Sequence, residues 1–374
     1  MRKWLKAPVR GWVCPGLIVL VLCSCQKPVE DPVPLVFIHG IKGSALGDDQ
    51  GKRHWLTIGQ ALGLSKSRIS LPTEWNGEEQ ARDSLKATEA LDGVYLIPGL
   101  VGEKIYGPFL KAARKMDRPV YVFAYDWRRD NLENLKLFIN FLKETSAANG
   151  NKKIQVVAHS MGGLITRAAL ADSPELFQSV IFAGVPFHGG VGFLPDVHAG
   201  EPVALNKTIL SPEVYFTFPS VYTLFPVEGS RVYDGDKELP LDFYDADDWG
   251  KYKLGLFALE LVSPAQAQHL RLSLKHAKEF RRLVSRPVKT DVPIYVVLSK
   301  HVPTLASVLR GGPKSLRGYD FETRPREPGD GRVLERDAIP PDLKHTILVS
   351  DEIHSDLLND SRVQDLVREA GIKP

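Results

Sequence analysis

A serine near the middle of the chain has neighbours typical of a catalytic turn. Residues 156–164 read VVAHSMGGL, with the small residues Ala158 and Gly162 two positions before and after Ser160. An apolar run precedes the serine, and a helical pattern, Met161–Ala171, follows it. A serine on a sharp strand-to-helix turn presents its hydroxyl at the edge of a sheet, where it can act as a nucleophile. The alternative is a tight turn without chemistry.

A serine hydroxyl is a weak nucleophile and needs a base. In folds with this turn, the chain order is serine, acid, histidine. His354 follows the apolar run Thr346–Val349 by a short polar loop, whereas His345 precedes that run. If the run is a parallel strand, only His354 lies at the carboxyl edge, where ligands bind. We therefore predict His354 as the base and keep His345 as the alternative.

An acid is expected to orient the histidine. The stretch PGDGRV, residues 328–333, places Asp330 between two glycines. Such a loop can direct a carboxylate at the Nδ1 atom of a histidine. Asp291, Asp320 and Asp337 compete for this role but have no comparable flanks. We predict Asp330 as the acid; the alternative is a glycine-rich turn with an incidental aspartate.

Acyl transfer at a serine also needs backbone N–H groups that stabilise an oxyanion. The N–H of Met161 lies at the N-terminus of the helix that follows the serine, where the helix dipole favours negative charge. The second donor is expected after the first core strand, in FIHGIKGSAL, residues 37–46. Gly40 lets the backbone approach closely there, so the N–H of Ile41 is the candidate.

The elements that must position these residues alternate along the chain. Short, almost continuously apolar runs predict strands covered on both faces. Alternation with helices predicts the α/β class: a mainly parallel central sheet with helices on both faces. The predicted strands are Leu35–His39, Val120–Tyr125, Ile154–Ala158, Ser179–Ala183, Ile294–Ser299 and Thr346–Val349, and the predicted helices are Leu132–Thr145, Met161–Ala171 and Val363–Ala370.

Two segments, residues 42–93 and 187–285, interrupt this alternation. Insertions of that length are commonly functional, so we interpret them as cap or lid insertions. The second starts at the same sheet edge as Ser160, and its aromatic residues predict an apolar pocket for long acyl chains. Alternatively, it is a surface subdomain that buries these residues in its own core. They are Phe187, Phe193, Tyr215, Phe216, Phe218, Tyr222, Phe225, Phe243, Tyr244, Trp249 and Phe257.

The first 24 residues have the pattern of a lipoprotein signal peptide. Four basic residues accompany an apolar run, Trp12–Leu22, which ends in Leu22-Cys23-Ser24-Cys25. This resembles the bacterial lipobox, in which the last cysteine is lipidated and becomes the N-terminus. All three cysteines lie within residues 1–25, so none is left for a disulfide in the remaining chain. The alternative is an ordinary cleaved signal peptide.

Residues 25–34 are expected to form a proline-rich tether between the lipid on Cys25 and the hydrolase domain, residues 35–374. This predicts a lipid-anchored protein of the bacterial cell envelope. Gln26 favours the outer membrane, facing the periplasm, over the inner membrane.

The charge balance excludes one large class of partners. Without the leader, 44 basic and 45 acidic residues remain, which gives no electrostatic case for nucleic-acid binding. The sequence suggests no metal site and no glycine-rich phosphate loop, so no metal or other cofactor is expected. The expected partner is membrane lipid, as substrate and as anchor. The oligomeric state is not predicted.

Together the motifs resemble those of the lecithin–cholesterol acyltransferase family, including its lysosomal phospholipase branch. The resemblance runs from residue 35 to about residue 370. Its stretches are AHSMGG (158–163), YDWRRD (125–130), GVPFHGG (184–190), PSVYTLFP (219–226), IYVVLSKHVPT (294–304), GDGRV (329–333) and HSDLLND (354–360).

The resemblance implies an α/β-hydrolase with a cap that acts on lipid acyl esters through Ser160, Asp330 and His354. It implies oxyanion donors at Ile41 and Met161. Arg332 is a departure, because the family commonly has threonine there. Residues 42–93 also lack the cysteines that close a lid loop in eukaryotic members.

For YDWRRD, pairing of Asp126 with Arg128 to brace a strand end competes with substrate contact through Trp127; Phe187 is a second candidate contact. The expected activity is a serine-dependent lipid acyl-ester hydrolase or O-acyltransferase with an acyl-serine intermediate. A carboxylesterase for small soluble esters and a non-catalytic lipoprotein scaffold are the alternatives.

Overall fold

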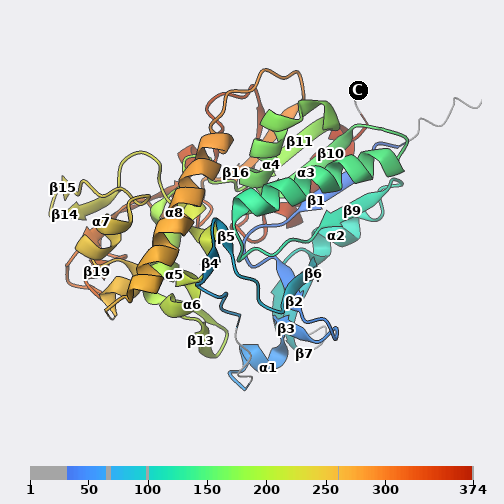
Figure 1. Cartoon of the computed structure of the whole chain (residues 1–374). Helices are drawn as coiled ribbons and strands as arrows, with labels where there is room; N and C mark the ends of the chain where they lie inside the picture. Colours follow the sequence, from blue (N-terminus) through green and yellow to red (C-terminus); the bar gives the residue numbers. More distant parts are fainter. Residues whose placement is uncertain (1–31, 65–68, 98–100, 260, 373–374) are drawn as a thin grey trace, which may run out of the picture. The chain divides into compact units, whose positions relative to one another are not determined.

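A six-stranded parallel sheet forms the centre of the computed structural model, which describes residues 32–64, 69–97, 101–259 and 261–372. The strand order is β21-β16-β11-β10-β1-β9, and all neighbouring strands are parallel (Figure 1). All six runs predicted as strands lie in this sheet. Their bounds are β1 Leu35–Ile38, β9 Val120–Phe123, β10 Ile154–His159, β11 Phe177–Ala183, β16 Ile294–Ser299 and β21 Thr346–Ser350.

Apolar cores cover both faces of the sheet. Successive side chains of a strand point to opposite faces, so each strand contributes to both cores. Val36 and Ile38 of β1 join one apolar core, and Leu35 and Phe37 join the other. Residues of α3, α4 and α8 belong to the first core, and residues of α2 and α9 to the second. The helices span α3 Asn131–Ala148, α4 Met161–Asp172, α8 Pro264–Val284, α2 Gly107–Ala113 and α9 Ser361–Ala370.

The strand order contains one reversal that matters for the site. From β1 the chain goes to β9 on one side, and then returns to β10 on the other side of β1. In open α/β sheets, ligands bind beyond the carboxyl ends of the strands at such a switch point. Gly40 and Ser160 follow the two strands that meet there, β1 and β10.

The segment after β1 contains small elements. Strands β2, β3 and β6 form an antiparallel sheet, and β4–β5 and β7–β8 are hairpins. The bounds are β2 Ser44–Gly47, β3 Arg53–Trp55, α1 Ile58–Ala61, β4 Trp75–Asn76, β5 Glu79–Gln80, β6 Lys86–Ala90, β7 Gly93–Ile97 and β8 Val101–Lys104.

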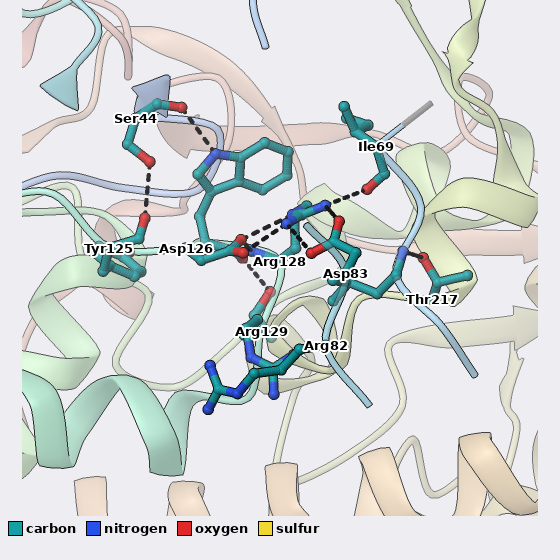
Figure 2. Close-up of polar contacts among 12 residues, drawn as sticks. Ser44, Ile69, Arg82, Asp83, Tyr125, Asp126, Arg128, Arg129 and Thr217 are labelled. Carbon is teal, nitrogen blue, oxygen red and sulfur yellow. Dashed lines mark hydrogen bonds and ion pairs between the residues drawn. The ribbon is translucent and has the colours of Figure 1, made fainter. Parts of the chain in front are cut away.

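A buried ion cluster ties this segment to the end of β9. The guanidinium of Arg128, which is fully buried, contacts an Asp126 oxygen at 2.7 Å, an Asp83 oxygen at 2.7 Å and the carbonyl oxygen of Ile69 at 2.9 Å (Figure 2). The predicted pairing of Asp126 with Arg128 is therefore confirmed. It braces the turn after β9 against the segment 69–83.

The segment between β11 and β16 contains the second predicted cap insertion and includes a long helix, α8. Its smaller elements are α5 Leu194–Ala199, β12 Glu201–Val203, β13 Asn206–Leu210, α6 Pro212–Phe216, β14 Val232–Asp234, β15 Lys237–Glu238 and α7 Ala246–Lys251. The sequence analysis did not predict α8, although its buried residues Leu270, Leu274, Ala277 and Phe280 recur every three or four positions. This helix packs on α3 and α4 (Figure 1).

Between β16 and β21, the hairpin-like pair β17 Val302–Leu305 and β20 Arg326–Gly329 is antiparallel, and β18 Val308–Arg310 and β19 Tyr319–Asp320 join β14 and β15 in a second sheet. The signal peptide, Cys25 and most of the tether lie outside the described residues. Within residues 32–372, as far as described, no helix is long and apolar enough to cross a membrane.

Candidate active site

Ser160 lies on a strained turn between β10 and α4. Its φ of 52° and ψ of −126° are unusual for a residue with a side chain, and such strain is found at functional sites. The turn is held by the N–H of Ser160, which donates to the carbonyl oxygen of Ala183 at 2.9 Å. A Cβ atom on Gly162 would lie 2.3 Å from the carbonyl oxygen of His39, so only glycine fits there. The strand-to-helix context predicted for the nucleophile is present.

His354 connects Ser160 to Asp330. Its Nε2 lies 3.0 Å from the Ser160 Oγ, and its Nδ1 lies 2.8 Å from an Asp330 carboxylate oxygen. Because an ionised carboxylate only accepts, Nδ1 carries the proton and Nε2 is free to accept the serine proton. The serine and the aspartate are buried, and 14% of the His354 side chain is exposed. The three residues thus have the geometry of a catalytic triad.

Asp330 is held in its charged form. Burial alone would raise its pKa, but the facing His354 and the N–H groups of Val333 and Arg332, at 2.7 and 2.9 Å from its second oxygen, hold the pKa below its ordinary value. The turn depends on Gly331, whose φ of 96° suits glycine. An ionised Asp330 can fix the tautomer of His354 and stabilise its protonated form.

The loop after β21 brings His354 to the site. The N–H of His354 donates to the carbonyl oxygen of Asp330 at 2.8 Å, so the base and acid loops are joined through their backbones as well. His345 precedes β21 and its Nδ1 contacts the carbonyl oxygen of Leu343 at 2.6 Å. The structure therefore brings His354, and not His345, to Ser160.

The two predicted oxyanion donors flank the serine. Met161 is the first residue of α4, so its N–H has no acceptor within the helix. Ile41 lines the same cavity as Ser160. Gly40, just before it, lies so close that an added Cβ atom would be 2.8 Å from the Cβ of Ser160. The loop that carries Ile41 therefore packs against Ser160, as the predicted donor requires.

A buried hydrogen-bond chain that the sequence analysis missed links three catalytic loops. The Gly40 N–H donates to the Tyr106 hydroxyl at 3.0 Å, and the Tyr106 hydroxyl lies 2.8 Å from the His159 Nδ1. The His159 Nε2 lies 2.9 Å from the carbonyl oxygen of His354, which can only accept. Nε2 therefore carries the proton, and Tyr106 donates to Nδ1.

The charges of this chain are fixed by burial. Burial and the neighbouring His354 lower the pKa of His159 to about 3, so its ring is neutral at physiological pH. Burial also raises the pKa of the Tyr106 phenol, which stays protonated and able to donate. The chain order serine, acid, histidine places the base after Ser160, so it gives no signal for His159. No sequence motif pointed to Tyr106.

A second histidine shapes the oxyanion loop. The Nδ1 of His39 donates to the Gly40 carbonyl oxygen at 2.7 Å, and its Nε2 lies 3.3 Å from the Tyr125 N–H. Its ring stacks on the ring of Tyr125, 4.4 Å between centroids. Burial lowers its pKa to about 4, so His39 is a neutral brace for the Gly40 turn.

A cavity of about 450 Å³ opens at Ser160 and His354. Seven of its lining residues come from the segment between β11 and β16: Phe193, Asp196, Val197, Glu201, Tyr215, Val221 and Leu224. The cap thus forms one wall of the cavity. Of the eleven aromatic residues considered above, Phe193 and Tyr215 line it, while Phe225, Phe243 and Trp249 pack on one another. The cap therefore has both an aromatic core of its own and a share of the cavity wall.

The two expected substrate contacts are corrected by the structure. Trp127 is fully buried, and its indole N–H donates to the carbonyl oxygen of Ser44 at 3.1 Å. Phe187 packs edge-on against Phe182 of β11, with 5.2 Å between the ring centroids. Neither lines the cavity at Ser160. Both side chains are part of the apolar core. The buried indole N–H of Trp127 has the internal acceptor that burial requires.

The cavity wall carries charges as well as apolar groups. Lys42, Asp196, Glu201 and Arg332 all line it and form a connected set of ion pairs. In the described residues, including this wall, no three His, Cys, Asp or Glu side chains are arranged to hold a metal ion.

Comparison with known proteins agrees with the motifs and the fold. Residues 80–244 match the family model of lecithin:cholesterol acyltransferase. An uncharacterized protein of Saccharomyces cerevisiae is 30% identical over 270 residues, which are 71% of this chain and 38% of that protein. Lecithin-cholesterol acyltransferase-like 4 of Arabidopsis thaliana is 27% identical over 210 residues, which are 45% of this chain and 37% of the relative. The chain thus spans less than two fifths of the length of these curated relatives.

Among solved structures, a chain of the Tle4–Tli4 complex superposes with a TM-score of 0.58 at 14% identity, over 91% of this chain and 98% of that chain. At this identity the likeness concerns the fold, which is that of an α/β-hydrolase. The match over residues 80–244 and the fold together support a chain similar to the lecithin:cholesterol acyltransferase family, with the fold of an α/β-hydrolase.

Proposed function

We propose that the protein is a serine-dependent lipid acyl-ester hydrolase or O-acyltransferase. The observation that supports this most is the continuous hydrogen-bonded set Ser160–His354–Asp330, at the wall of a cavity that the cap helps to form. The family and the names of its relatives agree with acyl-ester chemistry on lipids.

In the proposed reaction, the Oγ of Ser160 attacks the ester carbonyl carbon while the Nε2 of His354 takes the serine proton. The negative charge moves to the carbonyl oxygen, which accepts from the N–H groups of Ile41 and Met161. The intermediate collapses to an acyl-serine, and the leaving alkoxide takes the proton from His354. Water or a second alcohol then gives its proton to His354 and attacks the acyl-serine. The second intermediate collapses and releases an acid or a new ester, and His354 returns the proton to the Oγ of Ser160.

The cavity favours an apolar acyl group as the part of the substrate bound there. Apolar side chains from the oxyanion loop and the cap, including Ile41, Phe193 and Leu224, line it beside Ser160. Each methylene buried contributes about 0.8 kcal/mol, so long acyl chains gain most from such a wall.

The test combines active-site labelling with lipid turnover. A fluorophosphonate probe should label Ser160, and purified protein should release fatty acid from mixed membrane lipids, or transfer it to an added alcohol. Ser160→Ala, His354→Ala and Asp330→Asn should each lower turnover by roughly 10⁴-fold, because triad members act as a unit. All three variants should keep the wild-type circular dichroism spectrum. An active His354→Ala enzyme would contradict the assignment of the base.

Two other functions make different predictions. A carboxylesterase for small soluble esters would hydrolyse butyrate esters faster than lipid aggregates at every concentration. A non-catalytic scaffold would not react with the fluorophosphonate. The hydrogen-bond geometry at Ser160 favours catalysis over the scaffold, because a scaffold has no need of an aligned base and acid.

We also propose that the protein is lipid-anchored through Cys25 in a bacterial cell envelope, on the outer membrane facing the periplasm. The supporting observations are the basic, apolar leader and the sequence Leu22-Cys23-Ser24-Cys25. Two or more acyl chains anchor stably, whereas one anchors weakly. Mass spectrometry of the mature protein should find an acylated Cys25 at the N-terminus; an unmodified N-terminus elsewhere would contradict the proposal.

A further inference from the structure

The turn that carries the proposed oxyanion donor contains a strained lysine. Residues 40–43 form a tight turn, closed by the N–H of Gly43, which donates to the carbonyl oxygen of Gly40 at 3.2 Å. Lys42, the third residue of this turn, has a φ of 63°, in the left-handed region that glycine usually occupies. A residue with a side chain keeps such a conformation only where the surrounding structure holds it. The residue next to Ile41 is therefore under strain that another part of the protein must balance.

The cap supplies the contact that holds Lys42. The Nζ of Lys42 donates to a carboxylate oxygen of Glu201 at 2.5 Å, and its carbonyl oxygen accepts from the indole N–H of Trp55 at 3.3 Å. Glu201 begins β12 of the cap, and the hydroxyl of Tyr215 donates to the same carboxylate oxygen at 2.6 Å. The lysine side chain thus joins the oxyanion loop to the cap, which a glycine at this position could not do.

The same carboxylate also contacts the loop of the catalytic acid. Its second oxygen accepts from a guanidinium nitrogen of Arg332 at 3.3 Å, and the N–H of Arg332 donates to Asp330 at 2.9 Å. Burial would raise the pKa of Glu201, but Lys42 and Arg332 lower it to about 2, so Glu201 is negatively charged at physiological pH. One ionised side chain of the cap therefore links the oxyanion loop to the acid loop.

Stability alone does not explain why this turn contains a lysine. The Lys42 and Glu201 side chains are 24% and 21% exposed, and ion pairs that water can reach add little to the stability of a fold. The strained conformation of Lys42 acts against folding as well. A glycine would remove that strain, so the value of the lysine lies in what it positions.

We propose that Lys42 is a positioning residue for the oxyanion hole. Glu201 of the cap holds Lys42 in its left-handed conformation, and Lys42 in turn fixes the adjoining residue Ile41, whose N–H is the donor. The inference rests on the proposed function, because it concerns the oxyanion of acyl transfer. It makes the oxyanion hole dependent on the cap, because the donor is aligned with the charge that develops in the transition state only while cap and loop are joined.

The first experiment replaces the strained lysine by glycine, which can adopt the same turn. In Lys42→Gly, kcat for p-nitrophenyl butyrate and the rate of fluorophosphonate labelling of Ser160 should fall roughly tenfold, less than on loss of a donor, with KM within about twofold of the wild type. The urea midpoint should stay the same or rise. Lys253→Gly is the matched control: Lys253 is exposed, has a φ of 53° in a turn away from the cavity, and should leave both rates unchanged.

The second experiment tests the link to the cap. Glu201→Gln and Lys42→Met should each lower kcat for p-nitrophenyl butyrate. The double variant should lose no more than the larger single loss, because both residues act through one contact. Glu213→Gln, which changes an exposed residue of α6 in the cap, is the control. Glu201→Gln leaves the sequence of the oxyanion loop intact, so it decides the matter even if the lysine variants do not fold.

Each outcome supports or contradicts the positioning role. A lysine that only secures the cap predicts the opposite pattern: Lys42→Gly and Glu201→Gln would lower the urea midpoint and leave kcat and labelling at wild-type values, which would overturn the proposal. Losses of kcat that simply add in the double variant would also overturn it, because the two residues would then act separately. If Ser160 of the wild type does not label at all, the proposed function itself fails.

Discussion

Removal of one hydroxyl, in Tyr106→Phe, tests whether the buried chain from Gly40 to His354 positions the catalytic loops. The change deprives two buried groups of a partner, the N–H of Gly40 and the Nδ1 of His159. Each unpaired group costs about 1–3 kcal/mol, so unfolding should become easier by roughly 2–4 kcal/mol after partial relaxation. Gly40 immediately precedes the proposed oxyanion donor Ile41, so catalysis should fall as well.

The expected catalytic loss is roughly 10- to 100-fold in kcat with little change in KM. It is smaller than the roughly 10²–10³-fold loss on deleting an oxyanion donor, because the donor remains and only its support is removed. The assay is kcat for p-nitrophenyl butyrate and the rate of fluorophosphonate labelling of Ser160, with urea unfolding in parallel. Tyr222→Phe is the control, because its buried hydroxyl donates to the carbonyl oxygen of Phe216 at 3.1 Å, away from the cavity.

The control should lose about 1 kcal/mol of stability and none of its activity. If Tyr106→Phe becomes less stable but labels Ser160 at the wild-type rate, the chain supports the fold and not the site, and the reasoning is refuted.

Three further outcomes are expected. Arg128→Met should lower the free energy of unfolding by about 3–5 kcal/mol, because two carboxylates lose their buried partner, whereas the exposed Arg82→Met should cost under about 1 kcal/mol in urea unfolding. Burial lowers the pKa of His39, His198 and His269 to about 4 and that of His159 to about 3. The unfolded chain therefore binds more protons than the folded chain below pH 6.5, and stability should fall as the pH drops from 6.5 towards 4. A urea midpoint that does not change with pH over this range would contradict the prediction. Each of these histidines contributes up to about 1.4 kcal/mol per pH unit, offset in part by Asp196, whose pKa burial raises to about 6. Phe193→Ala should reduce the preference for oleoyl over butyryl esters before it reduces butyrate hydrolysis, measured as the ratio of kcat/KM values.

The sequence was most informative where one short stretch determines the local structure. The strands of the central sheet are apolar on both faces, so each can be recognised in the sequence as an apolar run without knowing which strands it pairs with. Gly162, two positions after Ser160, and Gly331, next to Asp330, are glycines that the two turns require, and His354 follows a strand whose direction selects it over His345.

Contacts between distant segments could not be predicted in this way. Lys42 and Glu201 are 159 positions apart, and Tyr106 and His159 are 53 positions apart, and neither pair has a local signature. Trp127 and Phe187 were misjudged for a related reason. An aromatic residue suits a core and an acyl pocket equally, and only the packing of distant elements decides between them.

The helix α8 has a consequence for how substrate specificity could be exchanged between relatives. The chain from β11 to β16 first builds the cavity wall, and then covers the sheet with α8, which packs on α3 and α4. A graft of the whole segment would therefore replace part of the domain core together with the pocket. The transferable module is residues 186–262, with its junctions before the cap and ahead of the capping box of α8 at Ser263. Chimeras cut there can acquire a new substrate wall while the host retains its own helical layer.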